Sequence, residues 1–236
     1  DATYKEEDSP YSLWNDCYKA IAAANAALDA INTMGNPSSL DPQRGEALLC
    51  RAYNHFVLVN IFSKAYSPKT STTDLGIPYM THLETTVSPE YTRGTVAEVY
   101  EKIAADIEAG LPLLNDAIYS VPKYHFNKKA AYAFATRFNL FYVKPDKSNY
   151  QKVVEYATQV LGSNPDRALR QMTNYIPLGA GDVTNAYVQA SENCNLLIIP
   201  AYSAAGRIGS GSGPRYNHGR EITTYETYWA KGPWGS

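Results

Sequence analysis

The residues of this sequence best suited to hold a ligand are four aromatic side chains near its C-terminal end. They follow a glycine-rich stretch, "AAGRIGSGSGPRYNHGR", and are Tyr225, Tyr228, Trp229 and Trp234. Aromatic rings stack on the apolar faces of sugar rings, while neighbouring polar groups fix the orientation of the sugar. The same residues could pack against other parts of the domain, so a binding surface and a core role both stay open.

A second group of candidate binding residues lies near the start of the first predicted helix. It comprises Tyr11, Trp14 and Asn15. Trp14 also begins an apolar helical stripe, which is typical of a core residue, so ligand binding and core packing are alternatives there. Asn25 belongs to the same stripe and must find hydrogen-bond partners if it is buried. We expect Asn25 and Arg51 to share a buried polar network rather than to contact a ligand.

The sequence contains no recognisable catalytic or metal-binding motif. The glycine-rich stretch lacks the spacing of a phosphate-binding loop, because Pro214 stands where the last glycine is required. The histidines lie in no metal-ligand spacing, and the cysteines form no CxxC pair, so we interpret both sets as structural. These residues are His55, His82, His125 and His218, with Cys17, Cys50 and Cys194. We therefore predict no catalytic residue, no metal ion and no cofactor.

The composition is that of a folded domain without a charged binding surface. Hydrophobic residues make up 44% of the 236 residues and charged residues 19%, which is enough apolar material to build a core. The formal net charge is only −2, so the sequence predicts no nucleic-acid partner and no attraction to an anionic membrane. No apolar run is long enough to cross a bilayer.

Helical periodicity dominates the first two thirds of the chain. Apolar residues recur at steps of three and four in five segments: 11–32, 42–62, 95–114, 127–143 and 149–161. We expect the first two segments to pair, the next two to pair, and the fifth to have a partner that the sequence does not reveal. Two of the segments are weakly alike, "LCRAYNHFVLV" and "ATRFNLFYV". The predicted fold is mainly α, with tetratricopeptide-like antiparallel helix pairs, long irregular loops and a loop-rich C-terminal portion.

A long segment interrupts the helices at 63–94. It contains "DLGIPYMTHLETTVSPEYTRGT", which carries too many apolar residues to remain in water, so we expect it to pack across the helices. The predicted domains are a helical scaffold over 1–162 with this inserted loop, and a loop-rich portion over 163–236 that forms a ligand face and is incomplete. Within the second portion, "NLLIIPAY" could form one buried strand.

The order of these features resembles the SusD/RagB family of nutrient-binding outer-membrane lipoproteins from Bacteroidetes. The similar stretches include "LWNDCYKAIAAANAALDAI", "GEALLCRAYNHFVLVNIF", "DLGIPY" and "RGTVAEVYEKIAADIEAGLPLL", and they span roughly 11–162. The resemblance implies a tetratricopeptide-like scaffold whose loops bind a glycan or a peptide at the cell surface. It also implies a SusC-like TonB-dependent transporter as partner, and no catalytic activity.

The chain departs from that family in several ways. It is shorter, it begins at Asp1, and none of its cysteines lies near the start, so membrane attachment would depend on a lipid anchor that this chain does not contain. The ligand residues of the family vary, so none can be carried over to this sequence. Two other functions stay open: a tetratricopeptide-like scaffold that binds only proteins, and a helical glycoside hydrolase with two acids about 5 to 9.5 Å apart.

Overall fold

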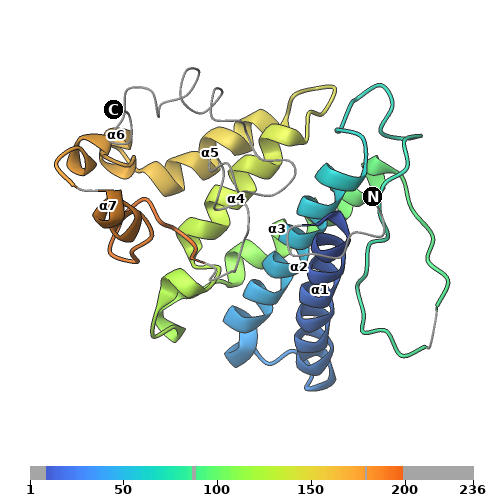
Figure 1. Ribbon diagram of the computed structural model, residues 1–236. Coiled ribbons are helices and arrows are strands. Elements are labelled where there is room, and N and C mark those ends of the chain that lie inside the picture. Colours follow the sequence, from blue (N-terminus) through green and yellow to red (C-terminus); the bar gives the residue numbers. More distant parts are fainter. Residues whose placement is uncertain (1–8, 87–88, 179, 199–236) are drawn as a thin grey trace. The chain divides into compact units, whose positions relative to one another are not determined.

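The computed structural model describes residues 9–86, 89–178 and 180–198, and within these ranges it contains helices and no strand (Figure 1). The chain divides into two compact units. One is Trp14–Ser163, and the other is built from the remainder of the chain. The predicted mainly α fold with paired helices is confirmed.

All five predicted helices are present, with ends close to those expected. The helices of the larger unit are α1 (Pro10–Thr33), α2 (Asp41–Phe62), α3 (Val96–Gly110), α4 (Lys128–Phe141) and α5 (Asn149–Leu161). The first four residues of α1 precede Trp14, where this unit begins. Short 3-10 turns join them: η1 (Ser38–Leu40), η2 (Leu111–Leu113), η3 (Asp116–Ile118) and η4 (Pro122–Tyr124). The other unit contains α6 (Pro165–Ala168), η5 (Met172–Tyr175) and α7 (Ala180–Tyr187).

The helix ends follow local sequence signals. The Thr95 hydroxyl accepts the Glu98 N–H while the Glu98 carboxylate accepts the Thr95 N–H, which is the predicted capping box at the start of α3. Asn127 caps α4 by accepting the Ala130 N–H. Gly162 ends α5 with φ of +66°, a conformation that favours glycine. The starts of α3 and α4 and the end of α5 therefore lie where local sequence signals place them.

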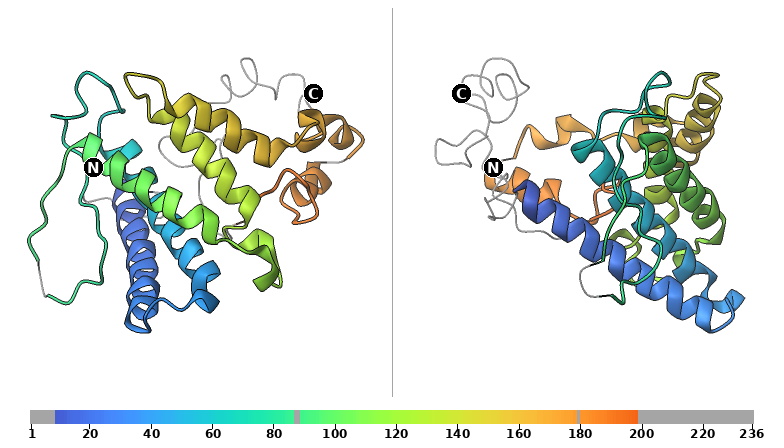
Figure 2. Two further views of the ribbon diagram at one scale, coloured as in Figure 1. Left: turned by 180° about the vertical axis from the view of Figure 1, so that it is seen from behind. Right: turned by 90° about the vertical axis from the view of Figure 1, so that its right-hand side faces the viewer.

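The helix partners differ from those we predicted. The closest packing joins α2 with α3 and α4 with α5, and Figures 1 and 2 show α4 and α5 side by side. We had paired segment 95–114 with 127–143 and left 149–161 without a partner. Two glycines explain the α2–α3 contact, because a Cβ on Gly45 would lie only 2.8 Å from the Gly110 carbonyl oxygen. Without side chains at this crossing, the two backbones can approach closely.

The core lies around α2 and α3, and the apolar faces predicted for both helices are buried. On α2 these residues are Leu49, Ala52, Phe56 and Val59, and on α3 they are Val96, Tyr100, Ile103 and Ile107, followed by Leu111 at the start of η2. The Phe56 ring meets Tyr100, Phe134 and Phe138 edge-on, at centroid separations of 5.7 to 6.4 Å. Such edge-to-face contacts stabilise the core beyond the burial of area alone.

The described residues of the C-terminal portion form short helices around Arg170. Its guanidinium lies 3.6 Å from the centroid of the Tyr187 ring and donates to Asn195 Oδ1 at 2.5 Å. The predicted strand in "NLLIIPAY" is not formed by residues 195–198, and the rest of that segment lies outside the described residues. None of the helices that the structure describes is both long and apolar enough to cross a lipid bilayer.

Candidate functional site

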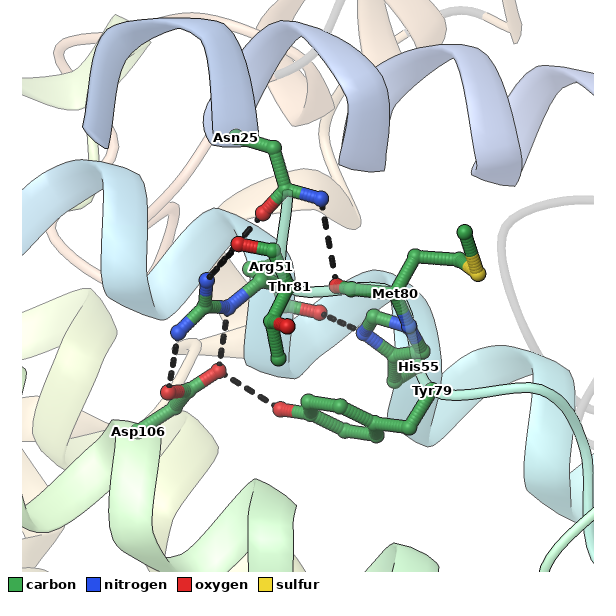
Figure 3. A network of polar contacts seen from close by, with 7 residues as sticks. All are labelled: Asn25, Arg51, His55, Tyr79, Met80, Thr81 and Asp106. Carbon is green, nitrogen blue, oxygen red and sulfur yellow. Dashed lines mark hydrogen bonds and ion pairs between the residues drawn. The ribbon is translucent and has the colours of Figure 1, made fainter. Parts of the chain in front are cut away.

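The connection between α2 and α3, residues 63–95, packs along the helices as the sequence predicted, and side chains of α1, α2 and α3 hold it there. Asn25 is completely buried, and its Nδ2 donates to the Met80 carbonyl oxygen at 3.1 Å. Arg51 donates from Nη1 to Asn25 Oδ1 at 3.1 Å and to the Thr81 carbonyl oxygen at 3.2 Å (Figure 3). The predicted buried network of Asn25 and Arg51 is therefore present, and its function is to satisfy loop carbonyl groups.

The charge of Arg51 is neutralised by Asp106 on α3. Two parallel hydrogen bonds of 2.7 Å join the guanidinium to the two carboxylate oxygens, and both side chains are buried. Burial alone would lower the pKa of Arg51, but the Asp106 hydrogen bonds and charge raise it above its usual value. The Tyr79 hydroxyl donates to the same carboxylate at 2.6 Å, so Asp106 fixes both the scaffold arginine and the loop tyrosine.

His55 is a neutral structural histidine in this network. Its Nδ1 lies 2.8 Å from the Arg51 carbonyl oxygen, and its Nε2 lies 3.0 Å from the Met80 backbone nitrogen. Because the carbonyl only accepts and the N–H only donates, the ring must carry its proton on Nδ1. Burial lowers the pKa of His55 to about 3, which agrees with a neutral ring. Its face stacks on Tyr79 at a centroid distance of 3.8 Å.

Two further side chains of α1, Tyr18 and Asp29, attach the same segment. The Tyr18 hydroxyl donates to the Pro78 carbonyl oxygen at 2.8 Å. Asp29 accepts the Leu83 N–H at 3.1 Å and lies 3.1 Å from Nδ1 of His82. The Leu83 hydrogen bond and His82 together hold the pKa of Asp29 below its usual range. The backbone of segment 78–83 is thus fixed by side chains of α1 and α2, while Asp106 of α3 holds the Tyr79 side chain.

This fixed segment forms one wall of a pocket against α1. The pocket has a volume of about 250 Å³, close to the lower end of the range for small-ligand sites. Its lining is aromatic and apolar with a few polar groups, and comprises Trp14, Tyr18, Ile21, Ala22, Asn25, Pro78, Met80, His82, Glu84 and Tyr91. We call it the aromatic pocket.

The aromatic residues of the pocket are held by neighbours. The Trp14 ring lies edge-on to Phe62 at 4.9 Å between centroids and is tilted against Tyr18 at the same distance. Tyr91 is 53% exposed, and its hydroxyl donates to Glu84 at 2.9 Å. The pocket therefore combines rigid aromatic surface with a carboxylate and a hydroxyl at its exposed side.

The structure brings one predicted binding residue into this pocket. Trp14 is half-buried and lines it, whereas Tyr11 is 45% exposed and Asn15 is half-buried on the same helix, and neither of these two lines the pocket. The predicted group of Tyr225, Tyr228, Trp229 and Trp234 lies outside the described residues. Whether any of these residues binds a ligand stays a prediction.

Sequence reasoning missed Tyr18, Glu84 and Tyr91, which line the aromatic pocket. The spacing of four between Trp14 and Tyr18 places both on one helix face, and this signal was available in the sequence. No comparable signal links Tyr91 to Trp14, because only the path of the connection brings them together. Among the described residues, no group of three or more His, Cys, Asp or Glu side chains could hold a metal ion.

The geometry is that of a scaffold of helix pairs with a pocket under an irregular connection. Residues 1–140 match a SusD-like family described as starch-binding and associating with the outer membrane. The chain therefore belongs to the SusD-like family, as its resemblance indicated. No curated protein matches it.

Solved structures of similar fold support the assignment. A SusD superfamily protein from Bacteroides thetaiotaomicron is 26% identical over 70% of this chain and 35% of its own, with a TM-score of 0.57. A sugar-binding protein from Bacteroides vulgatus is 22% identical over 89% of this chain and 47% of its own, with a TM-score of 0.65. A laminarin-binding SusD-like protein is 22% identical over 86% and 40%, with a TM-score of 0.57. The chain thus spans less than half the length of these structures.

Proposed function

We propose that this protein binds an oligosaccharide without transforming it and uses the aromatic pocket to do so. The observation that carries the proposal is the aromatic wall of Trp14, Tyr18 and Tyr91 beside the polar side chain of Glu84. Sugar rings offer an apolar face for stacking and hydroxyls for hydrogen bonding, and this lining provides partners for both. Similarity to sugar-binding and laminarin-binding structures of the same fold gives further support.

The pocket suits weak and reversible capture of one sugar unit. Its volume of about 250 Å³ is small for a whole oligosaccharide, so neighbouring units would extend over the surface around it. Glu84 can accept sugar hydroxyl protons, and the Tyr91 hydroxyl can also accept one while it donates to Glu84. The fixed segment 78–83 needs no ordering on binding, which keeps the entropic cost low.

We further propose that the protein acts at the outer membrane on the cell surface and passes its ligand to a SusC-like TonB-dependent transporter. The family match to proteins associating with the outer membrane supports this assignment. Co-expression with such a transporter, followed by purification through a tag on the transporter, tests the partnership. Recovery of the transporter without this protein would contradict it.

Replacing Tyr91 by alanine tests the sugar site directly. Tyr91 is exposed, so the substitution should remove a stacking surface while leaving the fold intact. A glycan array should identify a neutral or acidic oligosaccharide ligand of the parent protein, and titration calorimetry should show at least tenfold weaker binding for Tyr91→Ala. A tenfold loss corresponds to about 1.4 kcal/mol, which is within the range for one stacked ring together with the apolar area that it buries.

Tyr124→Ala is the matched control, because Tyr124 is also an exposed tyrosine but does not line the pocket. It should bind like the parent. Unchanged affinity in Tyr91→Ala, or equal losses in both variants, would move the site elsewhere. Glycan turnover during the titration would favour the hydrolase alternative, and the absence of any glycan ligand would favour the protein-binding scaffold.

A further inference from the structure

A second concave surface lies on the other side of the Trp14–Phe62 contact, around the end of α2. It has a volume of about 620 Å³, and its lining comprises Ile61, Phe62, Ser63, Lys64, Thr73, Asp74, Leu75 and Arg93. We call it the cationic cleft. Phe62 belongs to the cleft while its ring packs on Trp14 of the aromatic pocket, and Arg93 lies two residues after Tyr91. The two cavities therefore share a wall.

The charges in the cleft are unequal in their exposure. The Lys64 side chain is 75% exposed, whereas its partner Asp74 is only 10% exposed and lies 2.6 Å from the Lys64 amine. The Lys64 hydrogen bond holds the pKa of Asp74 below its usual range, so this carboxylate is ionised and already engaged. The ion pair balances the two charges, but the exposed Lys64 amine is the member that a ligand can reach, and Arg93 leaves the cleft with an excess of positive charge.

Arg93 adds a second cation with spare hydrogen-bonding capacity. Its Nε donates to the Gly76 carbonyl oxygen at 2.6 Å and its Nη2 to the Leu75 carbonyl oxygen at 3.3 Å. These bonds fix the guanidinium, while Nη1 has no hydrogen-bond partner within the described part of the chain. Because five N–H groups are available on a guanidinium, donors remain for an external anion.

Ser63 supplies a further polar group to the cleft, and its hydroxyl is unused by the described part of the chain. Among the described residues, its Oγ is a buried side-chain oxygen without any hydrogen-bond partner, and Ser63 lines the cleft. Buried polar atoms are usually satisfied, so such an atom at a cavity wall indicates a partner outside the chain. The Asp74 carboxylate and the terminal carbonyl groups of α2, which amount to about half a charge, oppose an anion here, but the two cations still exceed them together.

We infer that the cationic cleft is a second subsite, which takes the anionic group of an acidic sugar unit while the aromatic pocket stacks a neighbouring unit. This inference rests on the proposed function, because it specifies the ligand of the same protein as an acidic oligosaccharide. The anionic group is either a uronate carboxylate or a sulfate ester, since Lys64 and Arg93 can bind both. Exposed Ile61 and Leu75 flank the cleft and offer apolar surface to the sugar ring.

The test uses paired oligosaccharides that differ only in charge. Oligogalacturonide is compared with its carboxyl-reduced form, and a sulfated galactan oligosaccharide with its desulfated form, by titration calorimetry at low salt. The parent should bind at least one acidic member about tenfold or more tightly than its neutral partner, as expected for a charge-assisted hydrogen bond. Whichever pair shows this difference in affinity identifies the anionic group of the ligand as a carboxylate or a sulfate ester.

Two substitutions then locate the effect. Lys64→Gln should reduce the preference for the acidic member to threefold or less, whereas Lys69→Gln, an exposed lysine that does not line the cleft, should retain it. Ser63→Ala should weaken binding of the acidic member without lowering the melting temperature, because it removes a hydroxyl with no partner among the described residues. Melting curves of every variant verify folding.

The outcomes separate the two proposals. Equal binding of acidic and neutral members by the parent would overturn the cationic subsite and leave sugar binding intact. A preference that survives Lys64→Gln in a folded variant would also overturn it. If Tyr91→Ala leaves the binding of all four oligosaccharides unchanged, the aromatic pocket is not the sugar site. The anionic subsite in the cationic cleft is then tested separately by the loss of acidic preference in Lys64→Gln. Failure of the parent to bind any of the four oligosaccharides would overturn the inference.

Discussion

The inner and outer parts of the α2–α3 connection differ in what holds them. The backbone of the inner segment 78–83 bonds to side chains of α1 and α2, including Asn25, Arg51 and His55 (Figure 3). The outer part, described at 84–86 and 89–92, is mostly exposed, and within the described ranges the Tyr91 hydroxyl bonds to Glu84 alone. Both parts line the aromatic pocket.

This difference shows how an irregular segment can be rigid without secondary structure. Loop carbonyl and N–H groups that would pair in a sheet or helix are paired instead with buried side chains, so the backbone is satisfied without regular geometry. The outer part has few such ties and is free to vary in sequence at little cost. We therefore expect substitutions of the residues that hold the inner segment to change stability, and substitutions in the outer part to change binding.

Asp106→Ala should have the largest effect. It leaves the buried Arg51 without its carboxylate and Tyr79 without its acceptor, and breaking a buried ion pair in this way costs about 3–5 kcal/mol. Urea denaturation should show the loss as a lower midpoint. Asp16→Ala is the control, because its ion pair with Lys19 is fully on the surface and should contribute nothing measurable. Similar midpoints for the two variants would contradict a stabilising network.

His55→Gln should change how stability depends on pH. The unfolded chain takes a proton on this histidine near pH 6.5, whereas the folded protein does so only near pH 3. The stabilisation is therefore complete above pH 6.5 and is lost as the pH falls towards 3, by up to about 1.4 kcal/mol per pH unit. The variant should be less stable at pH 7 but lose less on acidification, as measured by urea denaturation from pH 7 to 4. Parallel pH profiles would show that His55 is not the group responsible.

Thr95→Ala should have an intermediate effect at the end of the connection. It removes the cap of α3, which costs about 1 kcal/mol of unfolding free energy. Ligand affinity should stay unchanged, because Thr95 lines neither the aromatic pocket nor the cationic cleft. Thermal melting and calorimetric titration measure the two quantities. A clear loss of affinity would show that the α3 end of the connection takes part in binding.

Tyr91→Ala should change stability least, by less than about 0.5 kcal/mol, because the side chain is largely exposed. Its expected effect is the loss of affinity described above. Destabilisation as large as that of Thr95→Ala would mean that the outer part is held as firmly as the inner one, and the contrast between them would not hold.

Local signals in the sequence predicted the helices well. The apolar faces of α2 and α3, the Thr95–Glu98 capping box and the Asn127 cap each depend on residues a few positions apart, and all are present. The packing of 63–94 over the helices was also predictable, because its apolar residues had to leave water. The helix partners were not, since the close approach of Gly45 and Gly110 depends on two residues far apart in the chain.

Periodicity, caps and family motifs are local properties of the chain, and they were enough to predict the helices, their buried faces and the membership of a SusD-like family. Which side chains satisfy the loop backbone, and which residues share a cavity, depended on the three-dimensional fold. Tyr18 with Tyr91, and Lys64 with Arg93, are distant in sequence and meet only through the path of the α2–α3 connection. That path is set by long-range hydrogen bonds and packing, which no local pattern encodes.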